Sequence, residues 1–423
     1  MKRFTPTTIL FILWILYLII GILTPNAVIQ SIWGDSRILS FPTIIWILFC
    51  CLAFAMGAFI EKAPFFKFRR YYNKPITITP QKIEENIRKF KFLLFLITFV
   101  LLGRFIWSVI LAGGLKNAFL MMFFKPIDFK FHFWQKTNIH GVGMIAELIV
   151  SATIFIFSYY AIILNYSGIE KNNIELEKFH KLKHKIVKYL MLTVLVLFVY
   201  LLFSNERVPF VGGLLGGLVA FVLIRDKISI KPFVYLGITF IWVWVFVEAA
   251  RRQFLNDQNL FFLLEFAKKR LFVYFAGGIR NIDTFVRYID DHSFGWYTFN
   301  FLITPFKLDT ILKIPDSFYG FGPNMIRPGY GAVPPFGTAY ADFGLVGLGF
   351  FMLWGFIYQK IYRYAIQKNN FIYLQIYAYF LVGLIVSFLV FLPSYSRFWV
   401  VILGLLFLNQ SISSGMKFKG TFK

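Results

Sequence analysis

Apolar residues occur along the chain in repeated runs, each close to the roughly 20 residues that a helix needs to cross a bilayer. Inside hydrocarbon a backbone must satisfy its own N–H and C=O groups, so each run is predicted to be a helix. The pattern predicts ten spans, at 8–24, 41–60, 92–112, 143–165, 187–203, 210–224, 232–250, 340–361, 372–391 and 398–412. The fold class that follows is all-α: a polytopic transmembrane helical bundle with about ten spans, forming a single integral membrane domain over 1–423.

Lysine and arginine gather in every second connection between these spans. The segment 61–91 is rich in lysine and arginine, and the segment 167–188 is rich in lysine. The C-terminal tail carries Lys417, Lys419 and Lys423. Positive residues mark the cytoplasmic side of short loops, so both termini are predicted to be cytoplasmic. The opposite, external side then receives five loops: 25–40, 113–142, 204–209, 251–339 and 392–397.

The loop 251–339 is long enough to escape the charge rule, and it is not featureless. Residues 261–275 form an amphipathic pattern typical of an interfacial helix. Residues 296–306 are apolar but too short to span, so we expect them to dip into the interface. A glycine- and proline-rich stretch, 320–337, cannot be regular helix. Loops held between rigid elements commonly carry function, which makes 251–339 the first place to look for a site.

Composition narrows the classes of function. Lysine and arginine outnumber aspartate and glutamate 44 to 20, a net charge of +24. Such an excess also marks nucleic-acid-binding proteins, but here it is spread over membrane loops, so nucleic acid is not expected as a partner. Two causes remain open: the positive-inside bias and an anionic substrate or lipid.

Other chemistries leave no signal in the chain. The two cysteines, Cys50 and Cys51, are adjacent within an apolar run and have no metal-ligand spacing, so they are interpreted as small apolar residues. The first apolar run lacks a small-residue cleavage site and is expected to be a retained anchor. No phosphate-binding loop, dinucleotide fingerprint or hydrolase motif is present, so no metal and no cofactor are predicted.

Several arginines fall near the predicted outer surface. A guanidinium grips phosphate oxygens through two parallel hydrogen bonds, so arginines at one membrane depth would suit a lipid-linked diphosphate. Each of them could instead reach lipid headgroups or pair with a carboxylate. The candidates for diphosphate or glycan contact are Arg207, Arg251, Arg280, Arg287, Arg327 and Arg397. Tyr330, close to Arg327 in the glycine- and proline-rich stretch, is a further candidate.

Three side chains are candidates for acid–base or orienting roles. Glu248 lies near the end of the seventh span, where it could pair with Arg251 and with Arg252 instead of taking part in chemistry. His292 could act as a base near neutral pH, or lie in a solvated turn. Asp342 could orient an arginine or accept a sugar hydroxyl, or simply cap the start of the eighth span.

Four features together are similar to one family. They are the Ser-Asn-Glu-Arg turn at 204–207 before a glycine-rich span, the large external loop after the seventh span with its tyrosine-containing helix, the Gly-Thr…Tyr-x-Asp-Phe-Gly-x-x-Gly pattern at 337–347, and the Tyr-Arg pair at 362–363. In these the chain resembles the Wzy-type polymerases of oligosaccharide repeat units, which build bacterial surface polysaccharides. The sequence departs from the family's paired arginine-glycine loop pattern, because Arg327 precedes Gly337 without a second copy.

The resemblance implies an enzyme of the bacterial cytoplasmic membrane whose active face is extracytoplasmic. Its substrates would be undecaprenyl-diphosphate-linked oligosaccharides, with membrane lipid and a chain-length regulator protein as further partners. It would transfer the growing chain from its lipid diphosphate onto an incoming lipid-linked repeat, making O-antigen, capsule or exopolysaccharide. Two other functions fit the same topology: a flippase for lipid-linked oligosaccharides and a ligase that attaches finished polysaccharide. A flippase would have more spans and internal repeats.

Overall fold

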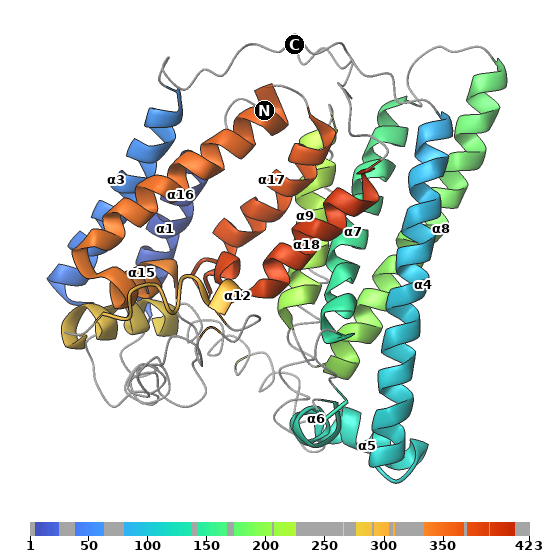
Figure 1. Ribbon diagram of the computed structural model, residues 1–423, viewed down its shortest axis with the longest axis horizontal. Coiled ribbons are helices and arrows are strands. Elements are labelled where there is room, and N and C mark those ends of the chain that lie inside the picture. The colour runs from blue at the N-terminus through green and yellow to red at the C-terminus, as the bar shows by residue number, and fades with distance from the viewer. Residues whose placement is uncertain are drawn as a thin grey trace. The chain divides into compact units, whose positions relative to one another are not determined.

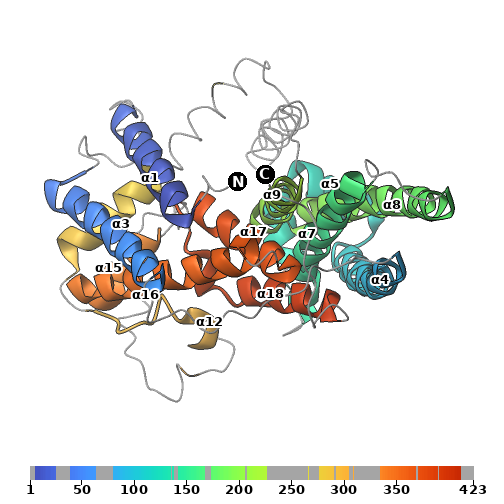
Figure 2. The same cartoon turned by 90° about the horizontal axis from the view of Figure 1, so that it is seen from above.

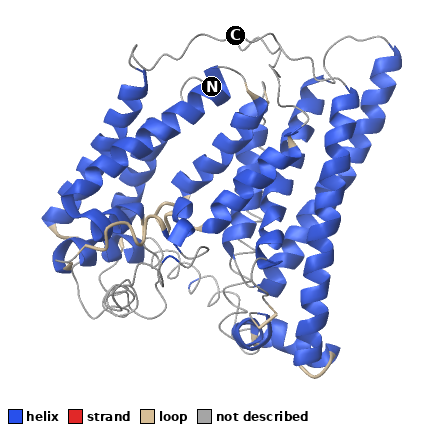
Figure 3. Ribbon diagram, in the orientation of Figure 1, coloured by secondary structure: helices blue, strands red, loops and turns tan. Residues whose placement is uncertain are grey.

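The computed structural model describes residues 5–24, 39–62, 80–134, 136–137, 142–166, 173–204, 207–225, 265, 276–289, 292–303, 308, 334–367, 370–388 and 390–410. Within these ranges the chain is helical and contains no β-strand, which confirms the predicted all-α class (Figure 3). Six helices there are long and apolar enough to cross a membrane, and three shorter apolar helices accompany them.

Figure 1 shows the principal helices, coloured in order along the chain. Their bounds are α1 Pro6–Leu23, α3 Phe41–Lys62, α4 Pro80–Leu111, α5 Leu115–Phe124, α7 Val142–Tyr166, α8 Asn173–Ser204, α9 Arg207–Ile224, α15 Pro335–Phe343, α16 Gly347–Tyr362, α17 Phe371–Ile385 and α18 Ser396–Leu408. Shorter pieces are α6 Pro126–Phe129 and α12 Asn300–Ile303. The predicted span 232–250 and the predicted interfacial helix 261–275 lie outside the described residues, Glu265 apart.

Helix boundaries differ from the predicted spans in two directions. The helix α4 begins twelve residues before the predicted 92 and α8 fourteen before the predicted 187, because charged helix-forming residues extend both helices beyond the apolar run. Hydropathy marks only the part of a helix that suits lipid. Conversely, the helical stretch predicted at 340–361 is divided, since a 3₁₀ turn at Gly344–Val346 separates α15 from α16.

By contacts the chain divides into two compact units. Unit 1 comprises residues 1–72, 268–368 and 380–399, and unit 2 comprises 73–267, 369–379 and 400–423. In unit 2, α7 is the most buried of the long helices, with 83% of its most apolar window covered. The glycines of α9 pack against it, because a Cβ on Gly217 would overlap the ring of Phe157.

Unit 1 is built on the close pairing of α3 and α16, which lie side by side (Figures 1 and 2). The two helices run in the same direction: Trp46 near the start of α3 contacts Gly347 at the start of α16, and Glu61 near the end of α3 contacts Arg363 just beyond α16. Small residues allow backbones to approach this closely in a membrane. A Cβ on Gly57 would overlap the main-chain oxygen of Met352.

The starts of α3 and of α15 converge on a helix at 276–288, drawn in gold in Figure 1. The Cβ position of Gly337 in α15 lies against Ile282 and Phe285 of that helix. Close by, the indole of Trp46 donates to the main-chain oxygen of Phe336 at 2.9 Å. This end of unit 1 therefore brings part of the long loop 251–339 onto the ends of spanning helices.

Candidate functional site

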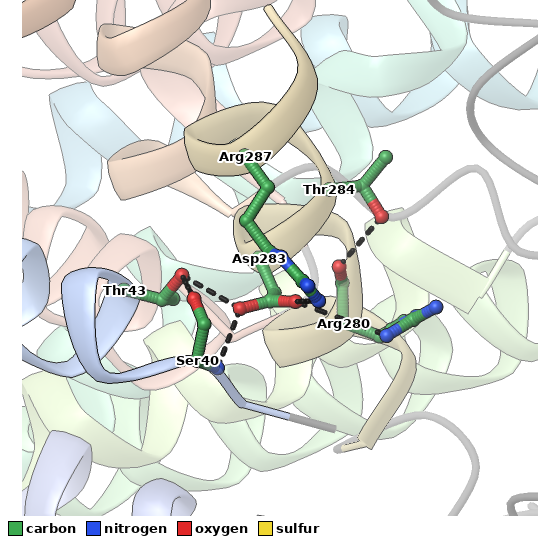
Figure 4. Close-up of polar contacts among 6 residues, drawn as sticks. All are labelled: Ser40, Thr43, Arg280, Asp283, Thr284 and Arg287. Carbon is green, nitrogen blue, oxygen red and sulfur yellow. Dashed lines mark hydrogen bonds and ion pairs between the residues drawn. The ribbon is translucent and has the colours of Figure 1, made fainter. Parts of the chain in front are cut away.

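Two arginines and one aspartate of helix 276–288 form a charged cluster (Figure 4). Asp283 lies three residues after Arg280 and four residues before Arg287, spacings that place all three on one helix face. The Nη1 atom of Arg287 lies 3.4 Å from Oδ2 of Asp283, and Nη1 of Arg280 lies 3.8 Å from the same oxygen. The two guanidiniums therefore converge on a single carboxylate oxygen.

The other oxygen of Asp283 is held by Thr43 of α3 and by Ser40, the residue just before that helix. The main-chain N–H of Ser40 and the hydroxyl of Thr43 each donate to Oδ1 at 2.7 Å. The hydroxyls of Ser40 and Thr43 also bond to each other at 2.9 Å. A carboxylate that accepts from fixed donors has a fixed position, so the start of α3 sets where Asp283 presents its second oxygen to the arginines.

Burial is graded across this cluster. The side chain of Asp283 is 1% exposed, that of Arg280 17% and that of Arg287 34%. Two guanidiniums and one carboxylate leave one net positive charge in the trio, and the charge faces outward because the anion is the buried member. Guanidiniums bind phosphate oxygens strongly, so the chemistry of the two arginines is compatible with a phosphate-bearing ligand.

A second buried carboxylate, Asp342 of α15, lies in the same unit. Its Oδ1 accepts from the main-chain N–H of Tyr297 at 3.0 Å and from the hydroxyl of Ser293, and its Oδ2 accepts from the N–H of Thr298 at 2.6 Å. Asp342 lies in the last turn of α15 instead of its first, so it caps the turns at 294–299 and not the start of its own helix.

His292 begins the segment that Asp342 holds. Its ring meets the ring of Tyr340 edge-on, with centroids 5.8 Å apart, and Tyr340 in turn meets Trp46 of α3 at 5.1 Å. The Nδ1 atom of His292 is buried and has no hydrogen-bond partner among the described residues. Trp46 and Thr43 are three residues apart on α3, so the aromatic row from His292 ends one helical turn from a residue that contacts Asp283.

Tyr297, whose main-chain N–H donates to Asp342, has a raised pKa. Burial, followed by the charge of Asp342, raises the pKa of Tyr297 to about 12. Its phenol therefore stays protonated at neutral pH and can donate a hydrogen bond but cannot act as a base.

Four of the candidate residues thus fall at one end of unit 1: Arg280, Arg287, His292 and Asp342. Arg397 also belongs to unit 1, where its guanidinium lies 5.8 Å from the ring centroid of Tyr395. Arg207 is the first residue of α9, and its side chain lies outside the described part. The remaining candidates lie outside the described residues altogether: Glu248, Arg251, Arg327 and Tyr330.

Sequence reasoning missed Asp283, although a signal was present. An aspartate flanked by arginines at i−3 and i+4 is the spacing of helical ion pairs, and it is readable without a structure. The contribution of Ser40 and Thr43 had no such signal, because some 240 residues separate them from Asp283. Glu147, in unit 2, was missed as well; it is 7% exposed and accepts from the hydroxyl of Tyr200 at 3.0 Å.

Arg104 is a charged residue within the predicted span 92–112, and it is buried in unit 2. Its guanidinium stacks on the ring of Trp134, 4.0 Å from the centroid, and donates to the main-chain oxygen of the same residue at 3.1 Å. At 8% exposed it packs as part of the helix bundle. No group of three histidine, cysteine, aspartate or glutamate side chains suited to a metal ion occurs among the described residues.

Comparison of the chain with models of known protein families, with curated proteins and with solved structures found no match.

Proposed function

We propose that this chain is a membrane glycosyltransferase that polymerises undecaprenyl-diphosphate-linked oligosaccharide repeat units into a surface polysaccharide, as its resemblance to the Wzy-type polymerases implies. The observation that carries the proposal is the convergence of Arg280 and Arg287 on the buried Asp283. Such a trio presents an outward positive charge at the end of a membrane-embedded unit, where the head of a lipid diphosphate would lie.

The reaction makes a particular demand on the site. A hydroxyl of the incoming repeat attacks the anomeric carbon of the growing chain, a new C–O bond forms, and the bond from that carbon to the diphosphate breaks. The lipid diphosphate leaves with the bonding electrons, so negative charge grows on its oxygens. Preorganised guanidiniums stabilise that charge, and losing one such donor raises a barrier by roughly 3–4 kcal/mol.

The remaining proton needs an acceptor. His292 is the candidate base, because one nitrogen of a neutral imidazole can accept a proton and Nδ1 of His292 has no hydrogen-bond partner in the described part of the chain. Asp342 is assigned a positioning role, since its oxygens are occupied by the segment that begins at His292. Arg207, Arg251, Arg327, Arg397 and Tyr330 remain candidates for glycan or diphosphate contact, and Glu248 for an orienting role.

In this proposal the active face is extracytoplasmic and both termini are cytoplasmic. The start of α3, the helix 276–288 and α15 would then lie at the outer surface, and the lysine-bearing end of α3 at the inner one. The diphosphate bond supplies the free energy, so no nucleotide is consumed.

A deletion strain tests the class of function. Accumulation of surface lipid carrying a single repeat supports a polymerase. Loss of all surface repeats points instead to a flippase, and free lipid-linked polymer points to a ligase; either outcome overturns the proposal.

Complementation of that strain tests the site. Arg280→Ala and Arg287→Ala should each lower polymer per folded protein by roughly 100- to 1,000-fold, as expected for one lost oxyanion donor. The matched control is Arg88→Ala, an exposed arginine of α4, which should leave polymer unchanged. Full-length polymer from both site variants would sink the assignment of the diphosphate to this cluster.

A further inference from the structure

The α3–α16 pair is tightest at its crossing. A Cβ on Gly57 would overlap the main-chain oxygen of Met352, and one on Gly355 would overlap that of Phe54. The helices are parallel, so residues four positions beyond each glycine leave the crossing on the same face and at the same level. Those residues are Glu61 on α3 and Gln359 on α16.

Both of these polar side chains are buried in unit 1. Glu61 and Gln359 are each 1% exposed. One turn further along, Nη2 of Arg363 lies 2.8 Å from Oε1 of Glu61, which forms an ion pair that ties the C-terminal ends of the two helices together. The chain continues from Arg363 as a π-helix to Gln367, an irregularity frequent at functional sites.

Three hydrogen-bonding atoms of Gln359 and Arg363 lack a partner in the part of the chain that the structure describes. Neither Oε1 nor Nε2 of Gln359 has a partner among the described residues, and nor does Nε of Arg363, although all three atoms are buried. The adjacent Tyr358 shows the usual pattern, since its hydroxyl donates to the oxygen of Phe380 at 2.9 Å. Burying an amide without hydrogen-bond partners costs free energy, and buried polar groups in proteins are usually hydrogen-bonded. Gln359 departs from this rule, and a bound ligand would supply its missing partners.

The chemistry of the unfilled atoms selects the ligand. A free amide oxygen accepts, whereas a free amide nitrogen and a guanidinium Nε donate, so the ligand must do both. The charges of Glu61 and Arg363 compensate each other, so neither a cation nor an anion gains a net attraction. A small neutral molecule with donors and acceptors satisfies all of these conditions, and water bridges buried polar groups of this kind.

We propose that the C-terminal ends of α3 and α16 enclose a hydrated polar site, in which water molecules bridge the Gln359 amide to the Glu61–Arg363 ion pair. The site is separate from the arginine cluster at the opposite end of α3 and does not depend on the proposed enzymatic function. Water reaches it from the end that bears the exposed Lys62.

Cysteine accessibility tests the proposal in the full-length protein. Cys50 and Cys51, both buried, are first replaced by alanine. A small water-soluble methanethiosulfonate reacts with a thiolate only where water reaches it, so Gln359→Cys should react at least about 100-fold faster than Phe351→Cys. Phe351 is the matched control because it lies two turns earlier on the same face of α16 and is likewise 1% exposed. Lys62→Cys gives the rate at an exposed position.

Equal rates for Gln359→Cys and Phe351→Cys would overturn the proposal. A second variant keeps it testable if the cysteine protein does not fold. Gln359→Leu removes hydrogen bonds to water in a hydrated site, so Tm should stay the same or fall. In a dry site the same change removes an unpaired amide, and a rise in Tm of more than about 2 °C would show that no water is present.

Discussion

Asp283 and Asp342 are two aspartates of unit 1 with almost the same burial and opposite surroundings. Their exposed fractions are 1% and 0%. Asp283 accepts from the hydroxyl of Thr43 in α3 and from the N–H of Ser40 just before it, and its other oxygen lies beside two guanidiniums. Asp342 accepts from two N–H groups and one hydroxyl of a single short segment, 293–298.

The difference teaches how a buried carboxylate can serve either structure or a site. Main-chain donors leave no freedom, so the charge of Asp342 is used entirely to hold the turns at 294–299. Asp283 instead has one oxygen held by Ser40 and Thr43 and its other oxygen beside two guanidiniums, so it joins the start of α3 to the two positive charges of helix 276–288. Degree of burial alone would not have separated the two roles.

The largest expected effect is the loss of fold when Asp342 is removed. Asp342→Ala leaves two buried N–H groups and a hydroxyl without their acceptor, which should lower the free energy of unfolding by on the order of 3–5 kcal/mol. Thermal unfolding of the purified protein in detergent measures this. The control is Asp342→Asn, which retains one oxygen acceptor and should lose less; an unchanged Tm for the alanine variant would contradict the capping role.

The next effect concerns function more than stability. Asp283→Asn keeps an oxygen for Ser40 and Thr43 but removes the charge that holds both arginines, so polymer per folded protein should fall by about 10-fold or more. Asp342→Asn should change that ratio by less than about 3-fold. Polymer length on gels, normalised to folded protein, gives both numbers, and equal losses in the two variants would erase the distinction between the carboxylates.

A smaller effect is expected at the hydroxyls. Thr43→Val removes one donor to Asp283 and should cost about 1 kcal/mol of stability together with a measurable shortening of polymer. Thr43→Ser should restore polymer length. The matched control is Ser293→Ala, which removes one hydroxyl donor to Asp342 and should cost a similar stability without shortening the polymer. Shortening by both variants would show that polymer length reports stability only.

The helices themselves were largely predictable from the sequence. Hydropathy located α1, α3 and α7 to within a few residues at both ends, because the bilayer imposes one apolar length on every span. Hydropathy misplaced the start of α8, because the first part of this helix is polar and a hydropathy pattern marks only the apolar part that suits lipid. The break at Gly344–Val346 was also missed, because its residues are as apolar as their neighbours.

The candidate site was predictable only in its cationic members. Arg280 and Arg287 stand out as charges in an external loop, and their residue type already points to phosphate. Asp283, the anion between them, is held by Ser40 and Thr43. No local sequence pattern predicts a contact between residues so far apart in the chain. His292 and Asp342 were singled out separately, but the contact of their segments depends on packing that periodicity does not encode.

The contact between Gly344 and His292 has a consequence for the evolution of the chain. Its φ of 55° with ψ of −136° is a backbone state that a side chain would strain, and a Cβ there would collide with Nε2 of His292. Two independent constraints, one conformational and one steric, therefore forbid the same replacement. Among descendants of this gene, residue 344 should remain glycine for as long as the imidazole keeps its place, and a lineage that loses the imidazole is released from the steric constraint but not from the conformational one.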